Sequence, residues 1–250
     1  MLLLLALCCQ PPADAPPTRL PVAVDLIGDD LSGWTGSLDD WTVEDGTLIG
    51  RTDGSLKANR FIWADIEPVR DFDLTVEVWV SAGGNSGLQY RSAKAPKFGP
   101  FALTGYQCDV VSTRDDYNGM LYEEKGRRIL AHTGEVVVID TDGHPWVTAT
   151  MPVPTFAPEQ WHTYRVRVVG NHHRHWIDGR PTIDAIDLDR NGRRLKGLLG
   201  VQTHVGPPME IRYRSMRLTR LPYTAAMTAD IPDDAERVVP QGQDRKRPKR

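Results

Sequence analysis

The sequence predicts an all-β protein, built as a two-sheet antiparallel sandwich or jelly roll. Three observations support this fold class. Many short apolar runs are separated by turn signals such as Asp45-Gly46 and Asp178-Gly179, and these dipeptides between apolar runs predict tight hairpins. Residues 72–80 alternate apolar and polar side chains, which is the period of a half-buried strand. No long stretch follows the 3.6-residue period of an amphipathic helix, so almost no helix is expected.

The expected strands follow one another with turn residues between them. In chain order, they fall within residues 22–26, 41–50, 56–64, 72–80, 88–91, 105–110, 119–124, 136–139, 161–168, 172–181, 198–204 and 209–221. Asp45-Gly46 divides the run 41–50 into a hairpin, and Asp178-Gly179 does the same for 172–181. Short strands at this spacing are typical of a sandwich.

Length and composition indicate one domain and exclude one class of ligand. The chain has 250 residues, of which 40% are hydrophobic and 25% charged, with a formal net charge of −3. This is enough chain for a single well-buried domain. Without the basic end at residues 245–250, the net charge of the rest of the chain is more negative. Nucleic acid is therefore not expected as a partner, because phosphate binding needs a basic face rather than a basic end.

The first residues resemble the end of a bacterial lipoprotein signal. The apolar run 1–7 is too short to cross a bilayer, and it precedes Cys8-Cys9 and a Pro-rich stretch at 10–21. We expect residues 1–9 to direct export to the periplasm or cell surface, with a lipid on Cys8 or Cys9 as the one membrane contact. The alternative is an apolar N-terminus without a targeting role. Residues 10–21 are expected to be a linker, 22–222 the β-sandwich domain, and 223–250 a basic, disordered tail.

A set of polar residues is expected on one sheet face. If the segments after residue 80 pair beside the strand 72–80, side chains two residues apart point the same way. That face would then carry Gln89, Arg91, Gln107, Asp109, Tyr122 and Glu124. Cys108 would point to the opposite face and is expected to be buried rather than a nucleophile.

Six segments, in this order and spacing, carry a resemblance to a known family. They are residues 84–91, 105–110, 119–124, 161–164, 175–179 and 200–208. Together they resemble the 3-keto-disaccharide hydrolase family, exported bacterial proteins with the concanavalin A-like jelly-roll fold of lectins and glucanases. The resemblance covers about residues 22–221. His162 stands where the family more often has Asn, and Gln107 where many relatives have Glu.

This resemblance implies cleavage of a carbohydrate substrate, a 3-keto-glycoside or 3-keto-disaccharide, by acid/base chemistry. A ketone at C3 acidifies the hydrogen on C2, so that a base can remove it and the enolate can expel the group on C1. Water then adds back, giving net hydrolysis. The route needs a base, an acid for the leaving oxygen and donors for the enolate oxygen. It does not need the nucleophilic carboxylate of a retaining glycosidase.

The candidate site residues follow from the matched segments. The expected catalytic residues are Asp109, Glu124 and His204. The expected substrate-binding residues are Asn85, Ser86, Arg91, Tyr106, Gln107, Tyr122 and Gln202. Asp109 and Glu124 would be the acid/base pair, and mutual repulsion would raise the pKa of one of them if they lie close. Arg91 and Gln202 would hold the ketone or enolate oxygen. His204 would shuttle a proton or bind a divalent cation with a carboxylate, although no metal ligand is assigned.

Other interpretations stay open. The same fold hosts non-catalytic carbohydrate-binding modules, and a structural protein without a ligand would fit if the polar residues were scattered. Arg91 and Asp109 could form a cross-strand ion pair that only positions the sheet. The histidines at 172, 173 and 175 would split between two faces of a hairpin, which disfavours a metal site. Glu123 is expected to be solvated. Convergence of the candidates on one face would discriminate an enzyme from these alternatives.

Overall fold

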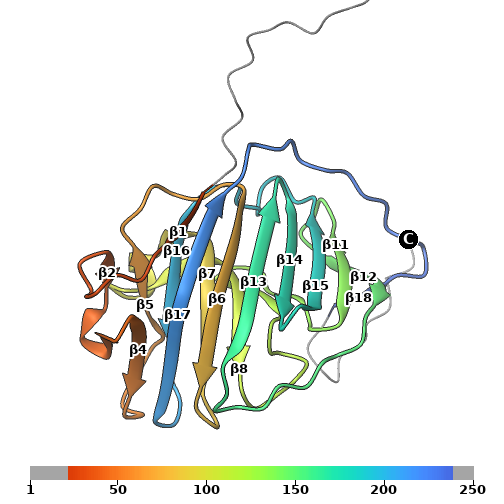
Figure 1. Cartoon of the computed structure of the whole chain (residues 1–250). Coiled ribbons are helices and arrows are strands. Elements are labelled where there is room, and N and C mark those ends of the chain that lie inside the picture. Colours follow the sequence, from red (N-terminus) through yellow and green to blue (C-terminus); the bar gives the residue numbers. More distant parts are fainter. Residues whose placement is uncertain (1–21, 239–250) are drawn as a thin grey trace, which may run out of the picture.

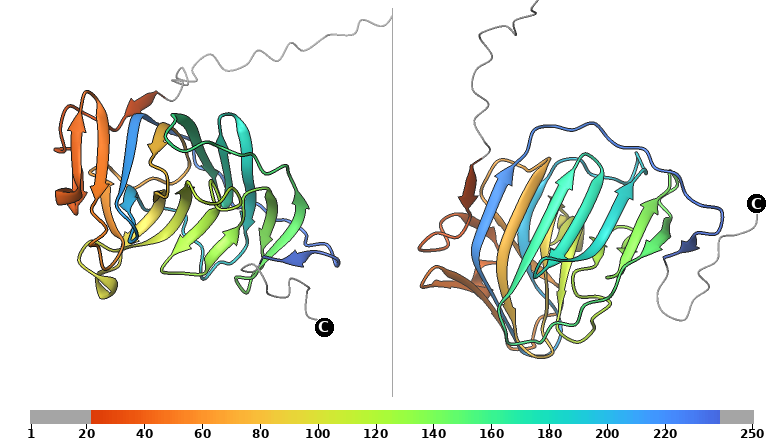
Figure 2. Two further views of the ribbon diagram at one scale, coloured as in Figure 1. Left: turned by 90° about the horizontal axis from the view of Figure 1, so that it is seen from below. Right: turned by 45° about the vertical axis from the view of Figure 1, so that its right-hand side comes forward.

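Two β-sheets packed face to face form the protein, and the computed structural model describes residues 22–238 (Figures 1 and 2). The eleven-stranded sheet has the order β18 (Glu236–Arg237), β12 (Pro145–Thr150), β11 (Glu135–Ile139), β15 (Arg180–Asp187), β14 (His172–Ile177), β13 (His162–Val169), β6 (Phe72–Val80), β17 (Met209–Arg220), β4 (Thr47–Thr52) and β3 (Trp41–Glu44), with β1 (Ala23–Asp25) paired to β17. The seven-stranded sheet has the order β10 (Arg128–Ala131), β9 (Leu121–Glu124), β8 (Leu103–Val111), β7 (Asn85–Lys94), β16 (Leu198–Thr203), β5 (Arg60–Ala64) and β2 (Trp34–Gly36).

The predicted all-β sandwich is confirmed. The helices among residues 22–238 are two single 3₁₀ turns, at Leu38–Asp40 and Pro96–Phe98. Strand pairs are antiparallel, except that β11 and β15 run parallel. Within the described range there is no helix with the length and apolarity to cross a bilayer.

The local signals read from the sequence form the elements they predict. Strand β6 begins at Phe72 and ends at Val80, and its buried residues alternate with partly buried ones. Asp45-Gly46 joins β3 to β4 with positive φ angles of 48° and 69°, and Asp178-Gly179 joins β14 to β15 with 49° and 74°. Two positive φ angles in succession are the geometry of the type I′ turn, which Asp-Gly favours.

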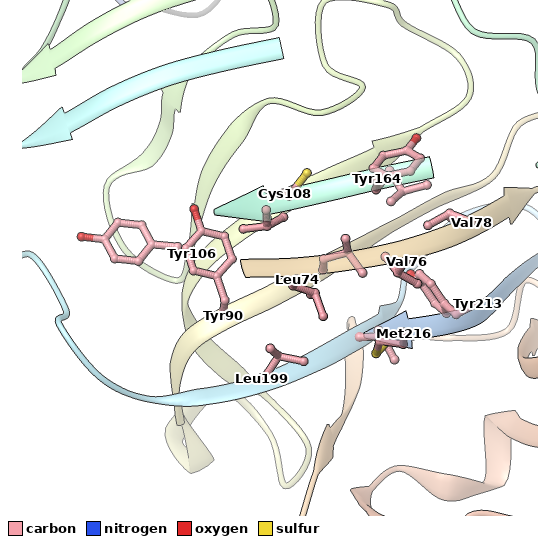
Figure 3. Close-up of a cluster of buried hydrophobic side chains, with 14 of the residues drawn as sticks. Leu74, Val76, Val78, Tyr90, Tyr106, Cys108, Tyr164, Leu199, Tyr213 and Met216 are labelled. Atoms are coloured by element: carbon pink, nitrogen blue, oxygen red, sulfur yellow. The ribbon is translucent and has the colours of Figure 1, made fainter. Parts of the chain in front are cut away.

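The hydrophobic core fills the space between the sheets. Leu74, Val76 and Val78 of β6 meet Tyr90 of β7 and Cys108 of β8 across it (Figure 3). The free thiol of Cys108 is fully buried, as expected for a packing residue, and burial raises its pKa well above the ordinary value. The face of the seven-stranded sheet turned away from this core is called the outer face below.

Two strands from late in the sequence, β16 and β17, occupy central places. Strand β16 lies between β7 and β5 in the seven-stranded sheet, and β17 lies between β6 and β4 in the other. Residues 198–220 therefore complete both layers.

The segment after residue 222 differs from the expected disordered tail as far as residue 238. Thr224 N donates to Asp71 Oδ2 over 2.7 Å, and Asn171 exchanges hydrogen bonds with the backbone of Met227. Strand β18 pairs with β12, and Val238 is buried in the core. The expectation failed because isolated backbone contacts with the sheet, rather than a periodic apolar pattern, hold this segment. Residues 1–21 and 239–250, with the signal, linker and basic end, lie outside the described residues.

Candidate functional site

The outer face of the seven-stranded sheet gathers polar side chains from neighbouring strands. On β8, Tyr106 and Cys108 point into the core, so Gln107 and Asp109 point outward. Gln107 pairs with Gln89 of β7 on one side and with Tyr122 of β9 on the other. Strand register thus places amides, a phenol and carboxylates on one surface.

A chain of hydrogen bonds crosses this face and ends on Asp109. Ser92 Oγ donates to Gln89 Oε1 over 2.7 Å, and Gln89 Nε2 donates to Gln107 Oε1 over 2.6 Å. Gln107 Nε2 in turn donates to Asp109 Oδ1 over 2.5 Å. Since each amide oxygen accepts from the preceding donor, both amides are fixed in orientation. Oδ2 of Asp109 makes no hydrogen bond with residues 22–238 and is the oxygen left for a ligand.

Gly87 makes room for this chain. It pairs with Asp109 across β7 and β8, and a Cβ placed on it would lie 2.3 Å from Cδ of Gln107. Real Cβ contacts do not come this close. The glycine is therefore needed by the Gln107 side chain, which occupies the space above it.

Asp109 is a carboxyl group that keeps its proton at neutral pH. Burial raises its pKa to about 8, the hydrogen bond from Gln107 lowers it, and the charge of Glu124 raises it further. The main cause is therefore loss of solvation rather than the repulsion expected between two adjacent carboxylates. A buried acid with a pKa near the working pH is suited to donate a proton.

Glu124 stands apart from Asp109 on the same face. It lies opposite Gly105 of β8, so its backbone is four residues, or about 13 Å along the strand, from that of Asp109. The two side chains still interact, because the charge of Glu124 raises the pKa of Asp109. No hydrogen bond joins the two carboxyl groups in the described chain. Glu124 is buried, and its Oε1 lies 3.0 Å from Nζ of Lys125. Gln107 and Tyr122 line the interval between the two carboxyl groups.

His204 follows β16 and is oriented by a backbone carbonyl. Its Nδ1 donates to the carbonyl oxygen of Val205 over 2.5 Å, so the neutral ring carries its lone pair on Nε2. Burial lowers its pKa, the hydrogen bond to Val205 and the charge of Glu124 raise it, and the charge of Lys125 lowers it. These charge effects tie His204 to Glu124 and Lys125 on the same face.

Gln202 offers an unused amide. Its side chain is fully buried, yet neither Oε1 nor Nε2 has a hydrogen-bond partner within residues 22–238. An unpaired buried polar group costs about 1–3 kcal/mol. Gln202 belongs to β16, the neighbour of β7, and pairs with Phe61 of β5. Asn85, at the start of β7, likewise has a buried Oδ1 without a partner in this range. Both amides thus keep unused hydrogen-bonding capacity in the described structure.

Arg91 does not join this site, and that prediction is wrong. The alternation of β7 breaks at Arg91, where φ is +47° and the pairing with β8 shifts. The buried guanidinium instead lies 3.1 Å from Asp71 and donates to the carbonyls of Arg70, Gly170 and Arg194. The cross-strand pair of Arg91 with Asp109 is therefore not formed, and Arg91 ties together loops at the end of the sandwich.

Two further candidates point into the core. The hydroxyl of Tyr106 donates to Asp187 Oδ2 over 2.6 Å (ring shown in Figure 3). Ser86 Oγ lies 2.6 Å from the carbonyl oxygen of Gln202 and 2.7 Å from the hydroxyl of Tyr213. Both expectations fail because these residues alternate with the outward-facing ones on their strands. Glu123 is also buried, paired at 2.6 Å with Arg127 rather than solvated.

Two residues of this face, Ser92 and Lys125, were not expected from the sequence. Ser92 begins the hydrogen-bond chain, and Lys125 pairs with Glu124. Gln89 was expected on this face without an assigned role, and it forms the second link of the hydrogen-bond chain. Ser92 could not be predicted, because it lies beyond the irregularity at Arg91.

The histidines of β14 lie in the other sheet, away from the outer face. His173 and His175 are buried in the core, both within hydrogen-bond distance of the Tyr90 hydroxyl, while His172 pairs with Asp184. The hairpin histidines thus split between two faces, as expected. Among residues 22–238, the group that could hold an ion is Asp140, Asp142 and His144, in the β11–β12 turn of the other sheet.

Comparison with known proteins supports this fold. No curated protein matches the chain. Among solved structures, a putative glycosyl hydrolase from Parabacteroides distasonis matches with a TM-score of 0.54 and 17% identity, covering 80% of this chain and 100% of that one. The carbohydrate-binding module CBM66 from Bacillus subtilis matches with a TM-score of 0.51 and 17% identity, covering 75% and 95%. A Bacillus licheniformis β-glucanase matches with a TM-score of 0.50 and 11% identity, covering 80% and 98%.

Similarity at these identities concerns the fold alone. The family comparison goes further, because one family model matches residues 23–219, most of the chain and all of the site described above. The protein belongs to the 3-keto-alpha-glucoside-1,2-lyase-like domain family, a carbohydrate-related family.

Proposed function

We propose that the protein cleaves 3-keto-glycosides by elimination across C1 and C2, followed by addition of water. One observation carries the proposal. Asp109, a buried carboxyl group with a pKa of about 8, shares the outer face with Glu124 and with the unpaired amide of Gln202. An acid, a base and a donor for the enolate oxygen are the groups that this reaction requires.

In the first step Glu124, ion-paired with Lys125, acts as the base. It takes the proton from C2, and the C–H electron pair forms the enolate with its charge on the C3 oxygen. The Nε2–H of Gln202 is a donor for that oxygen. The enolate then re-forms the ketone, the C1–C2 double bond is made, and the bond from C1 to the leaving oxygen breaks. Asp109 gives its proton to the leaving oxygen.

In the second step water adds to the C1–C2 double bond. Hydroxide is delivered to C1 and a proton to C2, which restores the sugar and makes the net reaction a hydrolysis. His204 is suited to take the proton from this water, because its neutral ring carries the lone pair on Nε2. Glu124, whose proton exchanges with solvent between the two steps, gives a proton to C2. Asp109 is then reprotonated from solvent, and His204 releases the proton it took to solvent.

The test is turnover of defined substrates. The protein is incubated with 3-keto-trehalose and with a 3-keto-glucoside, with and without EDTA, beside the unoxidised sugars. Released sugar from the keto compounds alone is expected, and deuterium from D₂O should enter C2. Loss of turnover with EDTA would indicate that a divalent cation takes part in the reaction. His204 and a carboxylate of the outer face are the residues that would hold it.

Binding without turnover is the outcome that favours a non-catalytic carbohydrate-binding module. The fold likeness to such a module supports this second function. Cleavage of unoxidised glycosides would contradict the elimination route.

Export and lipid attachment at Cys8 or Cys9 also belong to the proposal, supported by the residue pattern at 1–21. Expression in a bacterial host with labelled palmitate should label the wild type. The double variant Cys8→Ser/Cys9→Ser should stay unlabelled. Label on both proteins, or on neither, would contradict attachment there.

A further inference from the structure

A pocket rich in basic side chains lies beside Glu124. Its volume is about 380 Å³, and it forms where the β7–β8 loop, with its 3₁₀ turn, bends near the turn after β9. Four of its lining residues are cationic: Lys94, Lys97, Lys125 and Arg194. Thr104 adds a hydroxyl group and Phe98 an apolar wall.

The positive charge of this pocket is largely uncompensated. No acidic residue lines it, and the carboxylate of Glu124, next to its lining, is paired with Lys125. Within residues 22–238, Lys94, Lys97 and Arg194 make no ion pair, unlike many basic residues of the same range, such as Arg51, Arg127 and Arg165. Since the whole chain has a net charge of −3, this surplus is local. Like charges gathered in a concave site attract an anion from solution.

Two of these cations, Lys94 and Lys97, are exposed but rest on aromatic rings. Lys94 Nζ lies 4.9 Å from the ring centre of Trp63, and Lys97 Nζ lies 4.8 Å from that of Phe98. The backbone of Arg194 is fixed at both groups, because its N–H donates to the Tyr106 hydroxyl and its carbonyl accepts from Arg91. The ring contacts restrain the two ammonium groups, and the backbone contacts fix the point from which the Arg194 side chain enters the pocket lining.

We propose that this pocket binds an anionic group carried by the glycoside, so that the substrate class is an acidic 3-keto-glycoside. This inference rests on the proposed function, because it places the anion next to the base Glu124. A carboxylate, phosphate or sulfate group shares the chemistry needed: Arg194 can bind its oxygens in bidentate fashion, and the lysines supply point charges. Thr104 can donate a further hydrogen bond.

The test measures binding and needs no turnover. The full chain, labelled with ¹⁵N, is titrated at low ionic strength with glucuronate, glucose 6-phosphate, glucose 6-sulfate and, as the neutral control, glucose. The acidic sugars are expected to shift the amide signals of Phe98 and Thr104 and to bind at least about tenfold more tightly than glucose, which corresponds to about 1.4 kcal/mol. The three acidic probes decide which anion is preferred. High salt should weaken their binding.

Variants tie the effect to the pocket. The triple variant Lys94→Gln/Lys97→Gln/Arg194→Gln keeps Lys125 and Glu124 and should lose the preference for acidic sugars. Arg180→Gln/Arg190→Gln/Arg217→Gln, which removes three exposed cations outside the pocket, is the matched control for loss of surface charge and should keep it. Circular dichroism and thermal unfolding show that each variant is folded.

The outcomes separate the two proposals. Equal binding of glucose and the acidic sugars, or an unchanged preference in the triple variant of the pocket, would overturn the anion site and leave a solvated basic surface only. Binding of acidic sugars at Phe98 and Thr104 upholds the site, even if no 3-keto-glycoside is cleaved. In that event the proposed reaction is disproved and the anion site is supported.

Discussion

Gln107 Nε2 donates a 2.5 Å hydrogen bond to Asp109 Oδ1, two residues further along the same strand. The same amide accepts from Gln89, which accepts from Ser92. Asp109 is thus held by one oxygen in a buried setting, while its other oxygen makes no hydrogen bond with residues 22–238. This arrangement gives a proton donor with a fixed direction.

The pH dependence of stability should reflect the raised pKa of Asp109. An unfolded aspartate releases its proton near pH 3.8, whereas the folded protein keeps this proton to about pH 8. Between these values the folded state binds one more proton, so the stabilising contribution falls as pH rises, by about 1.4 kcal/mol per pH unit. Asp109→Asn lacks this dependence. Urea unfolding at pH 5 and pH 8 should show a larger loss for the wild type, and parallel losses would disprove the raised pKa.

Activity should depend on both carboxyl groups. Because Asp109 donates a proton, the rate should fall as pH rises through about 8. Asp109→Asn and Glu124→Gln should each abolish turnover of 3-keto-glycosides while leaving thermal unfolding cooperative. Rates near that of the wild type in both variants would remove this acid/base pair.

Gln107→Met should shift the pH profile. The hydrogen bond from Gln107 lowers the pKa of Asp109, so its loss should move the falling limb of the rate profile to higher pH and reduce kcat. Ser92→Ala, at the far end of the chain, is the control and should move the limb little. A reduced rate with an unmoved limb would show that Gln107 matters for packing alone.

Gln202→Leu should separate binding from stability. Because both polar atoms of this buried amide are unpaired in the described structure, an apolar replacement of similar size should leave the free energy of unfolding unchanged or raise it. Affinity for the keto sugar should fall by about tenfold, the value of one lost hydrogen bond of about 1.4 kcal/mol. Isothermal titration and urea unfolding measure the two quantities. Clear destabilisation would mean that the amide has a structural partner.

Arg91→Met should reduce stability and leave catalysis unchanged, the opposite of the result expected for Gln202→Leu. It would leave Asp71 without its partner in a buried ion pair, a change that costs about 3–5 kcal/mol. Urea unfolding should show this loss, whereas kcat of the remaining folded protein should change little. A stable but inactive variant would show instead that Arg91 takes part in catalysis.

Much of the fold could be read from local signals. Strand β6 has the ends that its alternation predicted, and the Asp-Gly turns form hairpins because their positive φ angles are local properties of the two residues. Tyr106 and Ser86 were misplaced although the signal was present. They stand in step with Cys108 and Leu88, which face the core, and strict alternation alone would have excluded them.

The remaining errors have long-range causes. The irregularity at Arg91 is set by its contacts with loops about 20, 79 and 103 residues away in the sequence. No local pattern announces it, and extrapolating the alternation across it fails. The electrostatic link of His204 to Glu124 and Lys125 also arises only once the strands are assembled.

The central positions of β16 and β17 bear on how the molecule is made. While the ribosome still holds residues 198–220, β7 and β5 lack the strand that joins them, and so do β6 and β4. The nascent protein would therefore present open strand edges, which invite wrong pairing. Residues 198–220 must therefore be synthesised before the native topology can close, and such distant contacts make folding slow.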